Sequence, residues 1–218
     1  MLKSIENFFH TLLDYILPPR TNFEIVKLLK EKDIYSLPKA VEIQEMSWIH
    51  SLFHYRDKRV KAIIWELKYN GNTSPLETIG KLIYEEIIGL TSDILLFNNN
   101  AEFLLIPIPI TSERRQERGY NQSEYIAKAV WENDLGHILL YAPQWFQKIK
   151  ETPRQSHSES KDERKKNLLN CFESDPRVSE KYIILIDDVA TTGSTLHEAK
   201  ITLLAAGARD VFAFTIAH

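Results

Sequence analysis

The stretch Ile183-Ile184-Leu185-Ile186-Asp187-Asp188-Val189-Ala190-Thr191-Thr192-Gly193-Ser194-Thr195 decides the fold of this chain. Four consecutive apolar residues are typical of a strand buried on both faces, and the two carboxylates mark its end. A hydroxyl-rich turn follows and opens a helix predicted over residues 194–206. A buried strand that passes through a short turn into a helix is the repeating unit of a parallel α/β sheet.

The turn after this strand is suited to a phosphorylated sugar. A helix N-terminus presents unpaired N–H groups and the positive end of the helix dipole, and Gly193 lets the backbone approach a ligand closely. Asp187 and Asp188 can accept hydrogen bonds from vicinal sugar hydroxyls beside the phosphate. A plain helix cap needs one hydroxyl, whereas this turn carries four: Thr191, Thr192, Ser194 and Thr195.

Other phosphate and nucleotide motifs do not fit. No two of the seven glycines have the spacing of a P-loop or a dinucleotide fingerprint. A receiver domain also places paired aspartates after an apolar strand, but near its start, and too little chain follows Asp188.

The stretch resembles the motif of type I phosphoribosyltransferases that binds phosphoribosyl pyrophosphate (PRPP). The resemblance implies that Asp187 and Asp188 are catalytic and hold the ribose 2′- and 3′-hydroxyls. It implies that Mg²⁺ bridges the pyrophosphate and sugar oxygens. The residues that it places around the 5′-phosphate are Ala190, Thr191, Thr192, Gly193, Ser194 and Thr195.

A second apolar strand, predicted over residues 103–109, ends in a polar segment with three arginines. Because parallel strands gather ligands at their carboxyl ends, Arg114, Arg115 and Arg118 can reach the same site. Their fork-shaped donors suit a diphosphate. Three arginines also fit a solvated surface run, and the neighbouring strand end favours a binding role for at least one.

The run Arg118-Gly119-Tyr120-Asn121-Gln122 resembles the ComF family of competence-associated phosphoribosyltransferase homologues, and Lys68-Tyr69-Asn70-Gly71 resembles an earlier block of that family. The resemblance implies that the loop after Pro109 binds pyrophosphate, with Arg118 catalytic. It also implies a flexible loop within residues 148–167 that closes over PRPP, carrying Gln155, Arg164 and Asn167.

The chain differs from many ComF-like chains in its potential metal ligands. Many ComF-like chains carry a four-cysteine zinc module near the N-terminus, whereas the single cysteine here is Cys171 and the histidines lack ligand spacing. We therefore expect no protein-bound metal site.

The pattern along the chain predicts two regions. Residues 1–100 are expected to form a largely helical hood, with helices over 1–17, 24–32, 59–67 and 76–88. Residues 101–218 are expected to form a phosphoribosyltransferase-like core. Its predicted strands, 103–109, 138–141, 182–186 and 211–216, alternate with helices over 120–131 and 194–206. This alternation predicts an α/β, doubly wound, mainly parallel sheet of the type I phosphoribosyltransferase kind.

Composition sets the limits of function. The 218 residues are 44% hydrophobic and 26% charged, as in an ordinary globular protein, and the net charge of −3 disfavours a general polyanion binder. One cysteine suits a reducing compartment, and no apolar run is long enough for a bilayer. The expected location is the cytoplasm, without membrane attachment.

The expected activity is transfer of a phosphoribosyl group from PRPP to an unidentified acceptor, with release of pyrophosphate. Residues that select the acceptor are expected in the region before Phe103. The sequence is also compatible with a homodimer. The alternative is a PRPP-sensing or single-stranded-DNA-handling accessory factor in DNA uptake. Tryptophans can stack on bases, although scattered tryptophans more often belong to the core; the four are Trp48, Trp65, Trp131 and Trp145.

Overall fold

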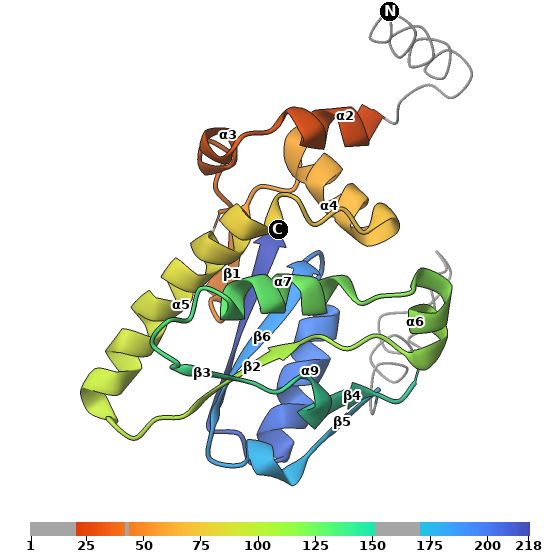
Figure 1. The fold of residues 1–218 in the computed structure, drawn as a ribbon. Helices are drawn as coiled ribbons and strands as arrows, with labels where there is room; N and C mark the ends of the chain where they lie inside the picture. Colours follow the sequence, from red (N-terminus) through yellow and green to blue (C-terminus); the bar gives the residue numbers. More distant parts are fainter. Residues whose placement is uncertain (1–20, 42–43, 151–170) are drawn as a thin grey trace, which may run out of the picture.

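A five-stranded, all-parallel sheet forms the centre of the molecule, in the order β1-β7-β6-β2-β3 (Figure 1). The computed structural model describes residues 21–41, 44–150 and 171–218. The five strands are β1 (Ile49–Phe53), β2 (Phe103–Pro107), β3 (Leu139–Tyr141), β6 (Tyr182–Val189) and β7 (Asp210–Ala217). The sheet confirms the predicted doubly wound α/β fold.

Helices cover both faces of this sheet. α5 (Leu76–Phe97) and α7 (Gln122–Trp131) pack on one face, and α9 (Ser194–Ala205) packs on the other (Figure 1). Alternate residues of β6 serve the two cores: Ile184 and Ile186 join the α5–α7 side, whereas Ile183 and Leu185 join the α9 side. This double burial explains the unbroken apolar run that marked the strand in the sequence.

Three further helices lie beyond the carboxyl ends of the strands (Figure 1). They are α2 (Thr21–Leu28), α3 (Glu31–Tyr35) and α4 (Lys58–Asn70). A single helix was predicted over residues 24–32, but two form. Within the described ranges, no helix combines the length and apolar character needed to span a bilayer.

Strand β1 was not expected from the sequence, which placed it in a largely helical region. It is short and carries two polar residues, so its pattern is weak. β7 supplies the missing context: Ser51 Oγ lies 2.7 Å from Thr215 Oγ1, and the His50 ring stacks on Phe214 at 4.8 Å. Hydrogen bonding and stacking across the strand pair therefore accommodate polar residues in a central sheet.

A short helix, α6 (Ser112–Arg118), replaces the loop expected after β2. Thr111 begins it, because its Oγ1 accepts a hydrogen bond from the backbone N–H of Arg114 at 3.4 Å. Gly119 ends it in the left-handed region, at φ 80°. The arginines consequently lie on a helix, which fixes their directions relative to one another.

The remaining elements are small. β4 (Phe146–Lys148) and β5 (Phe172–Ser174) form an antiparallel ribbon. Short 3₁₀ turns lie at Gln44–Met46, Pro143–Trp145 and Pro176–Val178. The helix predicted over residues 1–17 and most of the polar loop predicted over 148–167 fall outside the described residues.

The connections of the sheet locate its ligand crevice. From β2 the chain passes through α6 and α7 to β3, whereas from β6 it passes through α9 to β7 in the opposite direction. Ligands of open α/β sheets bind where neighbouring strands diverge in this way, at their carboxyl ends. The crevice therefore lies beside the end of β2 and the acidic pair of β6.

Candidate functional site

The acidic pair belongs to β6 itself, which the sequence pattern had ended at Ile186. Asp187 pairs in register with Thr215 of β7, and Val189 pairs with Ala217. Asp188 continues the alternation of the inward-facing residues of β6 and is buried on the α7 side. The pair is thus held by a rigid strand at the crevice.

The first turn of α7 contacts both carboxylates. Ser123 Oγ donates to Asp187 Oδ1 at 2.9 Å, and Gln122 Nε2 donates to Asp188 Oδ2 at 3.4 Å. Asn121 anchors this turn, since its Oδ1 accepts from the Ser123 N–H at 3.1 Å and its Nδ2 donates to the Ile108 carbonyl at 3.0 Å. The sequence indicated only that these residues open a helix.

A lysine from the N-terminal half of the chain also contacts the acidic pair. Lys68 Nζ lies 3.6 Å from Asp188 Oδ2. The lysine stands in the last turn of α4, which ends at Gly71 with a left-handed φ of 64°. Sequence reasoning recognised residues 68–71 as a family block but gave Lys68 no role, because its partner lies 120 residues away along the chain.

Asp187 titrates close to neutral pH. Burial is the main cause that raises the pKa of Asp187 to about 7, and the charge of Asp188 raises it further. The Asp188 N–H, the Ser123 hydroxyl and Lys68 act in the opposite direction. Additional hydrogen-bond donors, such as sugar hydroxyls, would therefore stabilise the ionised form of Asp187.

This raised pKa predicts that Asp187→Asn stabilises the protein in mild alkali. A carboxyl that binds its proton more tightly when folded adds stability below its ordinary pKa of 3.8, and this contribution is lost as pH rises through about 7. The asparagine keeps an acceptor for Ser123 but carries no charge. At pH 8 we expect urea unfolding to show the variant more stable by about 1–3 kcal/mol, with the difference shrinking toward pH 5.

A control variant with the opposite expected change in stability tests whether the pKa shift is the cause. Hydrogen bonds from Arg177 lower the pKa of Asp175 to about 2, so Asp175→Asn should reduce stability at pH 8. Loss of stability in Asp187→Asn at pH 8 would contradict burial as the cause of its pKa shift.

The turn after the pair is open to an anion. Gly193 occupies the N-cap of α9 with φ 67° and has no side chain to cap that helix; of its first N–H groups, that of Ser194 donates to Thr192 Oγ1 at 3.4 Å. A Cβ there would lie 2.8 Å from Met46 Sδ and would displace that flexible side chain, while the positive φ is the stronger reason for glycine at this position. Exposed hydroxyls surround the helix end, with Thr192 Oγ1 and Ser194 Oγ 2.8 Å apart. Thr191 is exposed, Thr195 is half-buried and Ala190 is buried.

The three arginines separate on α6. Arg118 reaches toward the pair, since its Nη1 donates to Gln122 Oε1 at 3.3 Å, whereas Arg115 forms an ion pair with Glu124. Arg114 is half-buried in the first turn of α6. The residues predicted for the flexible loop, Gln155, Arg164 and Asn167, lie outside the described residues.

The pair suits a metal that arrives with its ligand. Among the described residues, no group of three or more His, Cys, Asp or Glu side chains is arranged to hold a metal ion. Mg²⁺ commonly binds through one or two carboxylates together with substrate phosphates and water. Asp187 and Asp188 fit that donor set.

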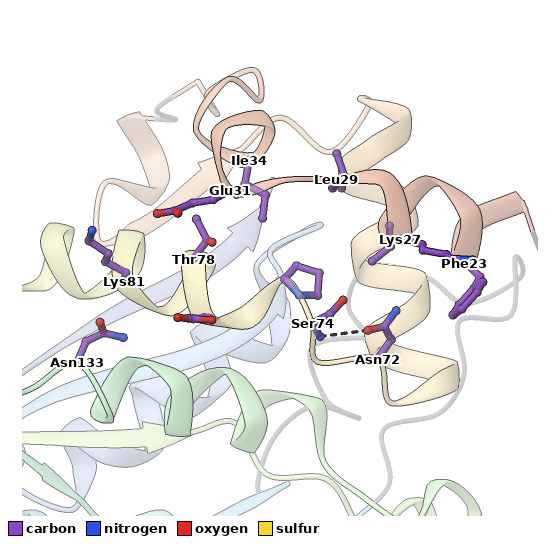
Figure 2. A pocket seen from close by; sticks show the side chains of 13 residues that line it. Phe23, Lys27, Leu29, Glu31, Ile34, Asn72, Ser74, Thr78, Lys81 and Asn133 are labelled. Atoms are coloured by element: carbon purple, nitrogen blue, oxygen red, sulfur yellow. Dashed lines mark hydrogen bonds between the residues drawn. The ribbon is translucent and has the colours of Figure 1, made fainter.

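A separate hollow of about 640 Å³ lies between α2–α3 and the start of α5 (Figure 2). Within it, the Ser74 N–H donates to Asn72 Oδ1 at 3.1 Å. Apart from Asn133, its lining residues precede Phe103, where acceptor specificity was expected. Those shown with labels in Figure 2 are Phe23, Lys27, Leu29, Glu31, Ile34, Asn72, Ser74, Thr78, Lys81 and Asn133.

Two of the four tryptophans are substantially exposed. Trp65 is 50% exposed and packs in a tilted arrangement against Tyr69, which is itself 54% exposed, with ring centroids 4.4 Å apart. Trp131 is 42% exposed and stacks on Tyr141. Trp48 and Trp145 are partly buried against the α9 core. Trp65 and Tyr69 share α4 with Lys68 and thus lie on the helix that contacts the acidic pair.

Comparison with known proteins found no matching family model. The chain is similar to DNA utilization protein YhgH of Salmonella typhimurium, with 27% identity over 70% of this chain and 64% of that protein. It is also similar to two proteins named competence protein ComFC. Identity is 36% over 54% of this chain and 45% of the Bacillus subtilis protein, and 32% over 76% of this chain and 66% of the Streptococcus pneumoniae protein. The chain thus spans less than two thirds of the length of these relatives.

Proposed function

Since this chain belongs to the ComF family, we propose that it binds PRPP and transfers the phosphoribosyl group to an unidentified acceptor, releasing pyrophosphate. The observation that carries the proposal is the side-by-side arrangement of the acidic pair and the open N-terminus of α9 at the switch point of the sheet. A phosphorylated sugar needs hydroxyl acceptors and phosphate donors side by side, and one strand–turn–helix unit offers both.

In this proposal the acidic pair, the α9 N-terminus and Arg118 each bind a different part of PRPP. Asp187 and Asp188 accept hydrogen bonds from the ribose hydroxyls and orient the ring, while the α9 N-terminus holds the 5′-phosphate. Arg118 stabilises the charge that develops on the departing pyrophosphate. Mg²⁺ that binds together with PRPP would neutralise part of the negative charge of the diphosphate. Because the reacting carbon gains oxocarbenium character, catalysis depends on orientation and electrostatics, with no described residue required as a general base.

The family also supports a biological setting. The relatives of this chain are named for DNA utilization and competence, and we propose that this chain acts in DNA uptake. A second candidate function is a PRPP sensor or a factor that handles single-stranded DNA. The exposed Trp65–Tyr69 pair favours it, because exposed aromatic rings stack on unpaired bases of any sequence.

We expect Arg118→Ala to lower pyrophosphate release more than it lowers PRPP affinity. A guanidinium that meets developing charge stabilises the transition state beyond the bound substrate, so kcat should fall about 10- to 1000-fold. Pyrophosphate would be assayed with PRPP, Mg²⁺ and a panel of acceptors, and Arg177→Ala, on the surface beside Trp145, is the matched control.

The same assay separates the two functions. Absence of pyrophosphate release across a broad acceptor panel, together with salt-sensitive binding of single strands that Trp65→Ala weakens, would favour the second function. Release that depends on both PRPP and one acceptor would favour the transferase.

A further inference from the structure

Gln122 lies between the acidic pair and the arginine helix. Its Nε2 donates to Asp188 Oδ2 at 3.4 Å, and its Oε1 accepts from Arg118 Nη1 at 3.3 Å. The residue opens α7 and is only 5% exposed. One buried amide thus joins β6 to α6.

The chemistry of this contact specifies a carboxamide. An ionised carboxylate only accepts hydrogen bonds and a guanidinium only donates them, whereas a carboxamide does both from one side chain. The neighbours of Gln122 therefore fix which way its amide points. Glutamate would repel Asp188, and methionine of similar shape would form neither bond.

The two ends of the contact are themselves held in place. Lys68 Nζ lies 3.6 Å from Asp188 Oδ2 and forms an ion pair with that carboxylate. The Arg118 guanidinium lies 5.7 Å from the centre of the Tyr69 ring, within the range of a cation–π contact. Lys68 and Tyr69 are consecutive in α4, so one helix restrains both partners of Gln122.

We propose that Gln122 is a positioning residue that couples the acidic pair to Arg118, so that sugar binding and diphosphate binding favour each other. This inference rests on the proposed function, which assigns the pair to the ribose and Arg118 to the diphosphate. Hydroxyls bound to Asp188 hold that carboxylate in place, Asp188 holds the amide, and the amide oxygen holds Arg118 toward the diphosphate. Such coupling is reciprocal, because each ligand must change the affinity of the other by the same factor.

Two separate ligands measure this coupling without chemistry. Ribose 5-phosphate and pyrophosphate are titrated calorimetrically at pH 8 with Mg²⁺, each alone and each in the presence of the other. The ratio of the two affinities of one ligand gives the coupling factor. We expect Gln122→Met to lower this factor about tenfold or more, the equivalent of one hydrogen bond to a charged group, relative to the wild-type chain.

The control carries the same substitution nearby. Gln116 is exposed on α6, and Gln116→Met should leave the coupling factor unchanged. If Gln122→Met does not fold, Gln122→Glu replaces it, because glutamate keeps an acceptor for Arg118 and sets a like charge against Asp188. That variant should also lower the factor.

Three results decide the inference. A factor that stays within about twofold of the wild-type value in a folded Gln122 variant overturns the coupling. A fall confined to Gln122 variants, with both ligands still binding singly, supports it. If neither ligand binds the wild-type chain, the proposed function itself fails, which distinguishes that failure from loss of coupling alone.

Discussion

The double variant Asp187→Asn, Asp188→Asn should lose nearly all affinity for PRPP. Each carboxylate is expected to accept a charge-assisted hydrogen bond from a ribose hydroxyl, and each such bond contributes about 1.5–3 kcal/mol. Two losses together correspond to a decrease in affinity of about 10²- to 10⁴-fold. Calorimetric titration of PRPP in the presence of Mg²⁺, at pH 8 where Asp187 is ionised, measures the change.

The fold must survive for this result to be informative. Asparagine can still accept from Ser123 and from the Asp188 N–H, so the local hydrogen bonds have a counterpart in the variant. Asp210→Asn is the matched control: this aspartate stands at the amino end of β7, opposite the crevice, where it pairs with Lys200. Unchanged PRPP affinity in the folded double variant would overturn the assignment of the site.

The second large effect concerns the contact between α5 and α7. A Cβ on Gly80 would lie 2.7 Å from the backbone carbonyl of Ala129, closer than real side chains come. Gly80→Ala must therefore separate the two helices, and overpacking of this kind costs about 1–3 kcal/mol. We expect the melting temperature to fall by about 2–12 °C, because each kcal/mol shifts a chain of this size by about 2–4 °C.

A second glycine of the same helix provides the comparison. Gly89 is exposed, and a Cβ there meets no atom within 4 Å. Gly89→Ala should therefore raise stability by about 0.5–1 kcal/mol, since alanine favours the helix. Equal melting temperatures for the two variants would contradict close helix contact at Gly80. The displacement also matters for the site, because α7 carries Gln122 and Ser123.

The local part of the site could be predicted from the sequence. The apolar run before Asp187, the hydroxyl-rich turn and the glycine at residue 193 are neighbours along the chain. Burial on both sheet faces, helix initiation and a left-handed φ each favour particular residue types within a few positions of the chain. For this reason the strand, the turn and α9 were expected within a few residues of their observed bounds, and the parallel α/β fold followed from their alternation.

Other parts of the fold were missed because their signals are weak or distant. The polar residues of β1 find partners on β7, more than 160 residues later. The arginine segment was expected as a loop, and only α6 separates Arg118, which faces Gln122, from Arg115, which faces Glu124. A helix spreads neighbouring side chains around its axis, so sequence adjacency did not show which arginine approaches the pair.

The sequence by itself determined that two carboxylates precede a hydroxyl-rich turn on a parallel α/β sheet. Only the tertiary structure decided what surrounds those carboxylates: Ser123 and Gln122 from α7, and Lys68 from α4. It also decided the burial of Asp187, which is the main cause of its raised pKa, whereas the second cause, the charge of Asp188, comes from the adjacent residue in the chain. The physical reason is that strand order and helix packing bring together segments more than 100 residues apart, and no local pattern records which segments meet.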